Sequence, residues 1–316
     1  MDRKCLICNS KVSNRNQRVR NGEYFEISFC QTCDFEFFSH NPNEGLEKDK
    51  LDLSRLASAG LAIPEVEEDF NNGLIQSKEY IDKYINHEDI GKNILEIGCS
   101  WGYFLKLLKD FGCNAYGVEI NNFRMSYVNS KLKINCKPDI AAYENKKLKF
   151  KKIFLFYVLE YIQNPVLYIS KLFDLLEPSG ELVIITPNLR DVLKEVFNNK
   201  AFNDFFYDKY AVNYFSIKSI TALSKKLNTQ MQETEIITNQ GYSFINHTNW
   251  HLNNEPKETK KVGGDNFVSN VVETIKNYDS ELSTRLIEFY NRSNGEYNKI
   301  IADAGLGNQI IIKFKK

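Results

Sequence analysis

Short apolar runs alternate with longer amphipathic stretches through the middle of this chain. Residues 93–97 form one such run, and from Tyr103 to Leu108 the apolar positions resume with helical spacing. Runs of this length, bounded by turn-forming residues, are typical of strands buried on both faces of a parallel sheet. The alternation therefore predicts an α/β fold with a doubly wound, mostly parallel sheet.

The turn between this first strand and its helix is rich in glycine. Glu96 lies at the end of the strand, and Gly98 and Gly102 bracket the turn. Such a turn aims backbone N–H groups and a helix N-terminus at a ligand, and no side chain blocks close approach. A second predicted strand, residues 113–118, ends in Glu119, where a doubly wound fold hydrogen-bonds ribose hydroxyls. We therefore expect a nucleotide-type cofactor.

These segments resemble the class I methyltransferases that use S-adenosylmethionine. The first motif of that family has the form (D/E)-x-G-x-G-x-G and is followed by an acid after the next strand. Ser100 stands where the middle glycine usually sits, a departure that is tolerable if Ser100 keeps an ordinary backbone conformation. For two residues, a purely structural role is as good an interpretation as cofactor binding: Asp139 as a loop carboxylate and Tyr157 as part of the core. The cofactor-binding residues that the resemblance implies are Glu96, Gly98, Cys99, Ser100, Gly102, Tyr103, Glu119, Ile120, Asp139 and Tyr157.

Three further segments continue the resemblance in the expected order. Residues 153–159, followed by Glu160 and Tyr161, are similar to the family's fourth strand and the stretch after it. Residues 176–188 resemble the turn into the fifth strand, and residues 213–216 resemble a segment found beyond it. The resemblance thus covers roughly residues 75–240.

Two Cys-x-x-Cys pairs near the start of the chain indicate a metal site. Cys5, Cys8, Cys30 and Cys33 are separated in the middle by a polar, hairpin-like stretch. Four thiolates at these spacings are typical of tetrahedral structural Zn²⁺, which leaves no position open for a catalytic water. Two disulfides or four unrelated thiols are the alternatives. Because the first residues show no signal-peptide pattern, we expect a cytoplasmic location, which disfavours the disulfides.

The pattern divides the chain into four predicted parts. Residues 1–45 form a zinc-binding module, and residues 46–90 a helical linker or cap with a break at 57–60. The methyltransferase core takes residues 91–240 and 309–316, with 235–238 and 309–314 as the antiparallel hairpin that ends the sheet in the resembling family. Residues 241–308, with a helix at about 267–290, are then an inserted cap on the substrate side, since so long an insertion is usually functional.

Composition and charge limit the classes of binding partner that we expect. Lys plus Arg and Asp plus Glu each number 41, so the formal net charge is zero, which argues against a large nucleic-acid surface. No apolar run approaches the roughly 20 residues that a membrane span needs. We expect a small-molecule substrate, and the sequence leaves the oligomeric state open.

The general base is difficult to place. The resembling families carry histidines at the positions of Tyr161 and Ala211, and an Asp at the position of Lys152, so the usual candidates are absent. His247 and His251 are four residues apart and share one face if their segment is helical, where imidazole could act near neutral pH. A polar surface turn is the alternative. The candidate catalytic residues are His247, His251, Glu160 and Tyr161.

The substrate class follows from resemblance alone. A cysteine module ahead of a class I core is similar to bacterial sugar methyltransferases that act on nucleotide-linked sugars or surface polysaccharides. This implies methyl transfer to a sugar or a similar small polar metabolite in polysaccharide biosynthesis, with the acceptor atom open. An RNA or protein methyltransferase is one alternative. A non-catalytic assembly partner is the other, and the departures at Ser100, Lys152, Tyr161 and Ala211 keep it open.

Overall fold

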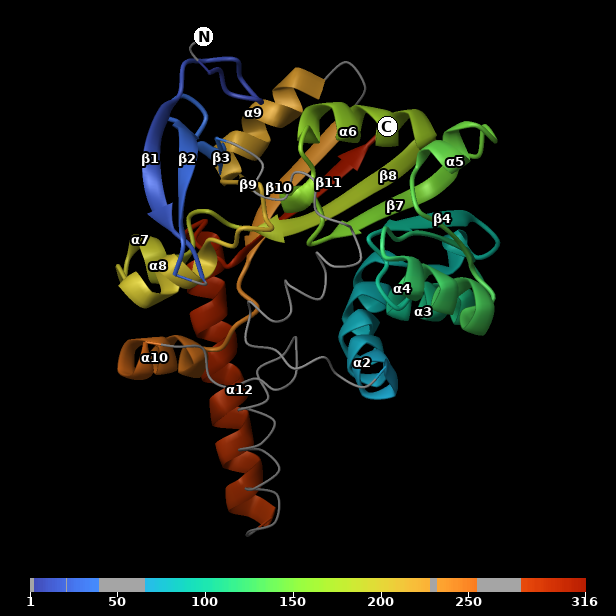
Figure 1. The fold of residues 1–316 in the computed structure, drawn as a ribbon. Helices are drawn as coiled ribbons and strands as arrows, with labels where there is room; N and C mark the ends of the chain where they lie inside the picture. Colours follow the sequence, from blue (N-terminus) through green and yellow to red (C-terminus); the bar gives the residue numbers. More distant parts are fainter. Residues whose placement is uncertain (1–2, 21, 40–65, 228–231, 255–279) are drawn as a thin grey trace.

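The computed structural model describes residues 3–20, 22–39, 66–227, 232–254 and 280–316. Its main sheet is built from β4 (Asn93–Ile97), β5 (Asn114–Val118), β6 (Asn135–Lys137), β7 (Phe150–Phe156), β8 (Leu176–Pro187), β10 (Glu233–Asn239) and β11 (Gln309–Lys315). The spatial order is β10-β11-β8-β7-β4-β5-β6 (Figure 1). Only β11 runs against its neighbours in this sheet, and all other adjacent strands run parallel. The predicted fold class and the predicted antiparallel hairpin are confirmed.

Both faces of this sheet are covered, which explains why its strands are apolar without interruption. One face carries α2 (Val66–Tyr84), α3 (Tyr103–Phe111) and α4 (Asn122–Tyr127), and the other carries α5 (Ala141–Glu144), α6 (Pro165–Leu175) and α9 (Ile217–Leu227). Along β4, Ile94 packs with Leu105 of α3, whereas Leu95 packs in the cluster that contains Leu172 and Ile220. Alternate residues of one strand therefore anchor helices on opposite faces.

A second sheet joins the N-terminal segment to the core. It consists of β1 (Ser13–Arg18), β2 (Tyr24–Cys30), β3 (Phe35–Phe38) and β9 (Asn213–Tyr214), in that order. Glu36 of β3 pairs with Tyr214, so a strand from the core segment completes the sheet of the cysteine module. The same module packs on α9, because Phe35 and Phe37 share a hydrophobic cluster with Ile220.

The remaining helices lie around the carboxyl ends of β8 and β10. They are α7 (Val192–Glu195), α8 (Lys200–Phe206), α10 (Phe244–Asn253) and α12 (Ser280–Asp303), which extends away from the body of the molecule in Figure 1. Among the described residues no helix has both the length and the apolar character of a membrane span.

Three expected boundaries need comment. The strand expected at 153–159 is instead Phe150–Phe156, because the chain turns sharply at Tyr157 and continues as a 3-10 turn over Leu159–Tyr161. The helix expected to end at about residue 290 continues to Asp303. The break at 57–60, residues 46–65 of the expected linker and residues 255–279 of the expected cap lie outside the described residues. The division into four parts stays a prediction.

Candidate cofactor and acceptor site

The glycine turn after β4 has the tight geometry that its sequence predicts. Gly98 and Gly102 have φ values of 72° and 83°, in the left-handed region that favours glycine. A Cβ atom on Gly98 would lie 2.5 Å from Cγ2 of Val158, and one on Gly102 would lie 2.8 Å from Cδ1 of Leu132. Both positions therefore exclude a side chain through backbone conformation and space alike.

Glu119 holds this turn from the end of β5. Its carboxylate accepts hydrogen bonds from the backbone N–H groups of Ser100 and Asn121, each at 2.8 Å. Asn121 in turn caps α4, because its side-chain oxygen accepts from the N–H groups of Phe123 and Arg124. The acid predicted to contact a ribose is thus also a structural link between the first two strand ends.

Ser100 corrects one expectation. Its φ is 51°, so it does not keep the ordinary backbone conformation under which the missing glycine was expected to be tolerated. A left-handed conformation costs a residue with a side chain roughly 1–2 kcal/mol. The Ser100 N–H bond to Glu119 and a contact of 3.4 Å between its hydroxyl and Tyr103 Oη accompany this conformation.

We expect Ser100→Gly to raise the free energy of unfolding by about 1 kcal/mol, because glycine adopts this φ without strain. Chemical denaturation of the purified protein measures the change. Ser179→Gly is the matched control, since Ser179 has a φ of 59° at an exposed position near the start of β8. Both variants should gain stability, and a loss of stability in Ser100→Gly alone would contradict the strain argument.

Glu96 carries an orphaned polar atom beside the turn. Its side chain is buried, and among the residues that the structure describes Oε2 has no hydrogen-bond partner. Burial, and then the neighbouring Cys136 and Glu119, raise the pKa of Glu96 well above its usual value. An uncompensated buried carboxyl is costly unless a ligand completes it. Its position at the end of β4 suits an ammonium group of a bound molecule.

Aromatic side chains cover the glycine turn. Trp101 packs edge-to-face against Tyr127 at 5.3 Å between ring centroids, and Phe70 of α2 lies 5.7 Å from Tyr103. A Cβ on Gly73 would lie 2.4 Å from the Tyr103 ring, so α2 packs closely on the start of α3. The turn therefore lies beneath α2.

The other predicted cofactor residues have diverse surroundings. Cys99 is buried with its sulfur 3.6 Å from that of Cys136, and Ile120 is exposed next to Glu119. Asp139 is exposed and accepts a hydrogen bond from the N–H of Ala141 at 2.7 Å, as a capping side chain does. Contact between these residues and a cofactor stays a prediction.

Two predicted acceptor-side residues line a small cavity of about 120 Å³ at the ends of β7 and β8. Glu160 is buried there and accepts a hydrogen bond from Thr186 at 3.1 Å. Tyr161 lines the same cavity, together with Arg20 and Asp208, whose charged atoms are 3.6 Å apart.

Sequence reasoning missed Arg20 and Asp208. No spacing links two residues so far apart along the chain, and a basic residue after a strand of a predicted zinc module is usually a solvated one. The guanidinium of Arg20 lies 4.0 Å from the centre of the Phe205 ring, which holds it at the cavity.

The two histidines proposed as bases lie on α10. Both ring nitrogens of His247 are in hydrogen bonds, with Tyr297 Oη at 2.6 Å and with Gln240 Nε2 at 3.1 Å. Burial lowers the pKa of His247 to about 4. His251 is exposed and packs against the Phe197 ring. Their role as general base stays a prediction, and the contacts of His247 favour a structural role.

The four predicted metal ligands converge. The sulfur atoms of Cys5, Cys8, Cys30 and Cys33 lie within 4.8 Å of one another, and the closest pairs are 3.5 Å and 3.4 Å apart. A tetrahedral Zn²⁺ with bonds of about 2.3 Å requires sulfur separations of about 3.8 Å. None of the seven cysteines, all of which are described, forms a disulfide. The cluster therefore fits zinc.

The two Cys-x-x-Cys turns have the same backbone conformation and the same hydrogen bond at the residue that follows each pair. The residue after each second cysteine, Asn9 or Asp34, has a left-handed φ of 62° or 58°. Its N–H donates to the carbonyl oxygen of Cys5 or Cys30, at 3.0 Å and 2.8 Å. Asn and Asp tolerate this conformation better than other residues with side chains.

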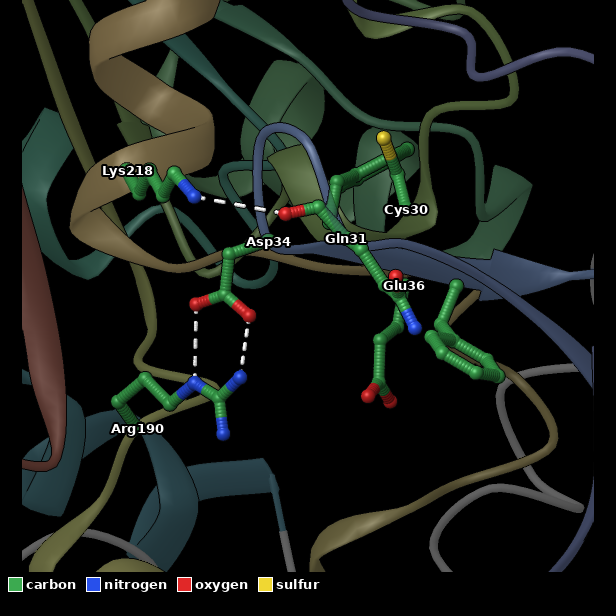
Figure 2. Close-up of a pocket in the computed structure, with 8 residues that line it drawn as sticks. Cys30, Gln31, Asp34, Glu36, Arg190 and Lys218 are labelled. Atoms are coloured by element: carbon green, nitrogen blue, oxygen red, sulfur yellow. Dashed lines mark hydrogen bonds and ion pairs between the residues drawn. The ribbon is translucent and has the colours of Figure 1, made fainter. Parts of the chain in front are cut away.

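A larger cavity, of about 480 Å³, lies between the cysteine module and two core residues, Arg190 in the segment after β8 and Lys218 on α9 (Figure 2). Arg190 forms a two-pronged ion pair with Asp34, and Lys218 donates to the backbone oxygen of Gln31 at 3.4 Å. Although burial opposes its ionisation, Arg190 holds the pKa of Asp34 below its usual value. The opposite charges of Arg190 and Asp34 compensate one another, and this ion pair connects the cysteine module to the core.

Comparison with known proteins agrees with this geometry. The family model described as a methyltransferase domain matches residues 75–234, and the chain belongs to this family. It is therefore an S-adenosylmethionine-dependent methyltransferase. No curated protein matches the sequence significantly.

Several solved methyltransferase structures are similar to this chain at low identity. A SAM-dependent methyltransferase from Archaeoglobus fulgidus is 17% identical with a TM-score of 0.46, over 79% of this chain and 97% of that one. The plantazolicin methyltransferase BpumL in complex with SAH is 15% identical with a TM-score of 0.46, over 87% and 92%. A possible histamine N-methyltransferase from Thermotoga maritima is 14% identical with a TM-score of 0.44, over 84% and 94%. Likenesses at this level say nothing of the acceptor.

Proposed function

We propose that this methyltransferase binds S-adenosylmethionine at the glycine turn and transfers its methyl group to a sugar or a similar small polar metabolite. The observation that carries the cofactor site is the uncompensated carboxyl of Glu96 beside a turn that excludes Cβ atoms at two positions. Glu96 would hold the ammonium group of the cofactor, and Glu119 its ribose hydroxyls. A cationic ammonium group would compensate the Glu96 carboxylate.

Methyl transfer requires, above all, that the acceptor atom be aligned with the methyl group of the cofactor. The cofactor supplies an activated methyl group, and holding the acceptor in line with it can contribute roughly 7–11 kcal/mol. The order of the strands indicates the side from which an acceptor approaches the cofactor. With Glu119 at β5 and Glu96 at β4, an acceptor approaches from the β7 and β8 side, where Glu160 and Tyr161 line the small cavity.

The polar acceptor is supported by the lining of that cavity. Arg20 and Asp208 offer a donor and an acceptor side by side, and Tyr161 and Phe206 offer aromatic surface. This combination suits a hydroxylated ring, which presents both hydrogen-bonding edges and apolar faces. Polysaccharide biosynthesis remains part of this proposal, and Glu160 and Tyr161 are its candidate catalytic residues.

Calorimetric titration with S-adenosylmethionine and S-adenosylhomocysteine tests the cofactor site. We expect Glu119→Ala to weaken binding by about 100-fold, since it removes a charged hydrogen-bond acceptor and two contacts of the turn. Asp110→Ala, an exposed acid at the end of α3, should leave affinity unchanged. Absence of binding by folded wild-type protein would refute the proposed site.

Release of S-adenosylhomocysteine in the presence of nucleoside diphosphate sugars tests the acceptor. Arg20→Ala should lower turnover of any sugar that reacts, whereas Arg18→Ala should not. Arg18 pairs with Asp204 between the same two segments, at 2.9 Å, and does not line the cavity. Equal losses in both variants would assign Arg20 to the interface rather than to the acceptor.

We also propose that the cysteine cluster binds one structural Zn²⁺. All four ligands are cysteines, so a bound ion would have no open position, and none of the four lines the small cavity that contains Glu160 and Tyr161. The ion would then stabilise the module that carries Arg20.

A further inference from the structure

Tyr157 has a backbone conformation that large residues rarely adopt. Its φ is 57°, at the point where β7 ends. Bulky residues persist in the left-handed region only where their surroundings hold them, and such strain gathers at functional sites. Here the backbone N–H donates to the carbonyl oxygen of Ile185 at 2.8 Å, and the phenol donates to the side-chain oxygen of Gln309.

This residue is adjacent to the cofactor turn. The following residue, Val158, fills the space where Gly98 would carry a Cβ, at 2.5 Å. The preceding residue, Phe156, stacks on Tyr80 of α2 at 4.3 Å between ring centroids. Burial raises the pKa of Tyr80, and the neighbouring Tyr157 hydroxyl opposes this shift, so the two phenols lie close to each other. The strained residue therefore lies between the turn and the helix that covers it.

The partners of the phenol also connect it to the inserted segment. Gln309 is the first residue of β11, directly after Asn308. Asn308 accepts from the N–H of Gly241 at 2.7 Å, and its own N–H donates to the side-chain oxygen of Gln240 at 3.0 Å. The two ends of the insertion are thus joined to each other next to the phenol. A displacement of Tyr157 would affect α2, β11 and the insertion together.

Tyr157 directly follows the carboxyl end of β7, and Gln309 begins the antiparallel strand β11, so both residues lie at the edge of the sheet from which an acceptor would approach. The phenols of Tyr80 and Tyr157 lie next to each other, and Glu96, whose buried Oε2 has no hydrogen-bond partner among the described residues, lies on the adjacent strand β4. Such a wall is electron-rich and attracts a cation. The sulfonium of S-adenosylmethionine carries a positive charge, and the thioether of S-adenosylhomocysteine does not.

We propose that Tyr157 is a positioning residue for methyl transfer, whose phenol acts through Tyr80 and Gln309 to hold this wall against the sulfonium. The assignment rests on the proposed cofactor site. It implies that Tyr157 contributes to the preference for the charged cofactor over its uncharged product. A purely structural tyrosine would affect both ligands alike.

The ratio of the two affinities, measured by calorimetry on the full chain, tests this. We expect Tyr157→Phe to weaken S-adenosylmethionine binding about tenfold and to change S-adenosylhomocysteine binding by less than about threefold. Tyr157→Asn, which tolerates the left-handed backbone, should shift the ratio in the same direction. Tyr143→Phe is the control, because its buried phenol donates to two backbone carbonyl oxygens beneath β5 and β6. It should leave the ratio unchanged.

Two outcomes separate this assignment from the function on which it rests. Equal losses for both ligands, or an unchanged ratio in Tyr157→Phe and Tyr157→Asn, would overturn the role of Tyr157 and leave the cofactor site intact. Failure of folded wild-type protein to bind either ligand would overturn both.

Discussion

Removal of the metal from the cysteine cluster is expected to unfold the β1–β3 sheet. Structural zinc sites contribute about 10–16 kcal/mol of apparent binding free energy in small domains, more than any other single change considered for this chain. Cys5 precedes β1 and Cys33 lies in the turn between β2 and β3, and their sulfurs lie 3.5 Å apart. Without the ion, four thiols in close contact would have to share a site built for thiolates.

Metal analysis and hydrogen exchange measure this effect. Wild-type protein should contain about one zinc ion per chain, and Cys33→Ser should lose it. Amide protection of Tyr24–Cys30 should fall, and protection of β9 should fall with it, because Asn213 and Tyr214 pair with β3. Cys113→Ser, outside the cluster, should keep the metal. Full protection in metal-free protein would contradict a structural role for zinc.

Lys152→Ala is expected to lower the free energy of unfolding by about 3–5 kcal/mol, the range for breaking a buried ion pair on one side. Lys152 and Asp89 are both buried, with Nζ 2.7 Å from the Asp89 carboxylate. The same ammonium donates at 2.7 Å to the carbonyl oxygen of Tyr84, the last residue of α2. Truncation leaves Asp89 buried without its counter-charge, and it releases the end of the helix that covers the glycine turn.

Urea denaturation and a double-mutant cycle measure this pair. Lys151→Ala, whose side chain makes an exposed contact with Ser179, should change stability by less than about 0.5 kcal/mol. Asp89→Asn combined with Lys152→Met should recover part of the loss, because neither charge then remains unpaired. Additive effects of the two single changes would show that the pair does not couple.

This ion pair also explains one departure from the resembling family. Lys152 stands where that family carries an Asp, and the departure had kept a non-catalytic interpretation open. In the structure it lies within β7 and joins the strand to α2 and to the 3-10 turn at His87–Asp89. The lysine at position 152 therefore has a structural role, and its presence does not argue against catalysis.

Local spacing carried most of what could be predicted. The apolar runs, the bracketing glycines and the paired cysteines are signals that involve neighbours a few residues apart. Backbone geometry restricts such neighbours so strongly that the pattern implies the structure. The doubly wound sheet, the tight turn between Gly98 and Gly102 and the convergence of Cys5 with Cys33 were all accessible in this way.

Contacts between distant segments had no such signal. The pairing of β3 with β9, the approach of Arg20 to Asp208 and the burial of Lys152 against Asp89 each depend on how complete elements pack. The left-handed conformations of Ser100 and Tyr157 belong to the same class, because surrounding contacts outweigh the intrinsic preference of each residue. Sequence periodicity thus specified the elements and the glycine turn. The cavity that we propose for the acceptor is formed by side chains that packing alone brings together.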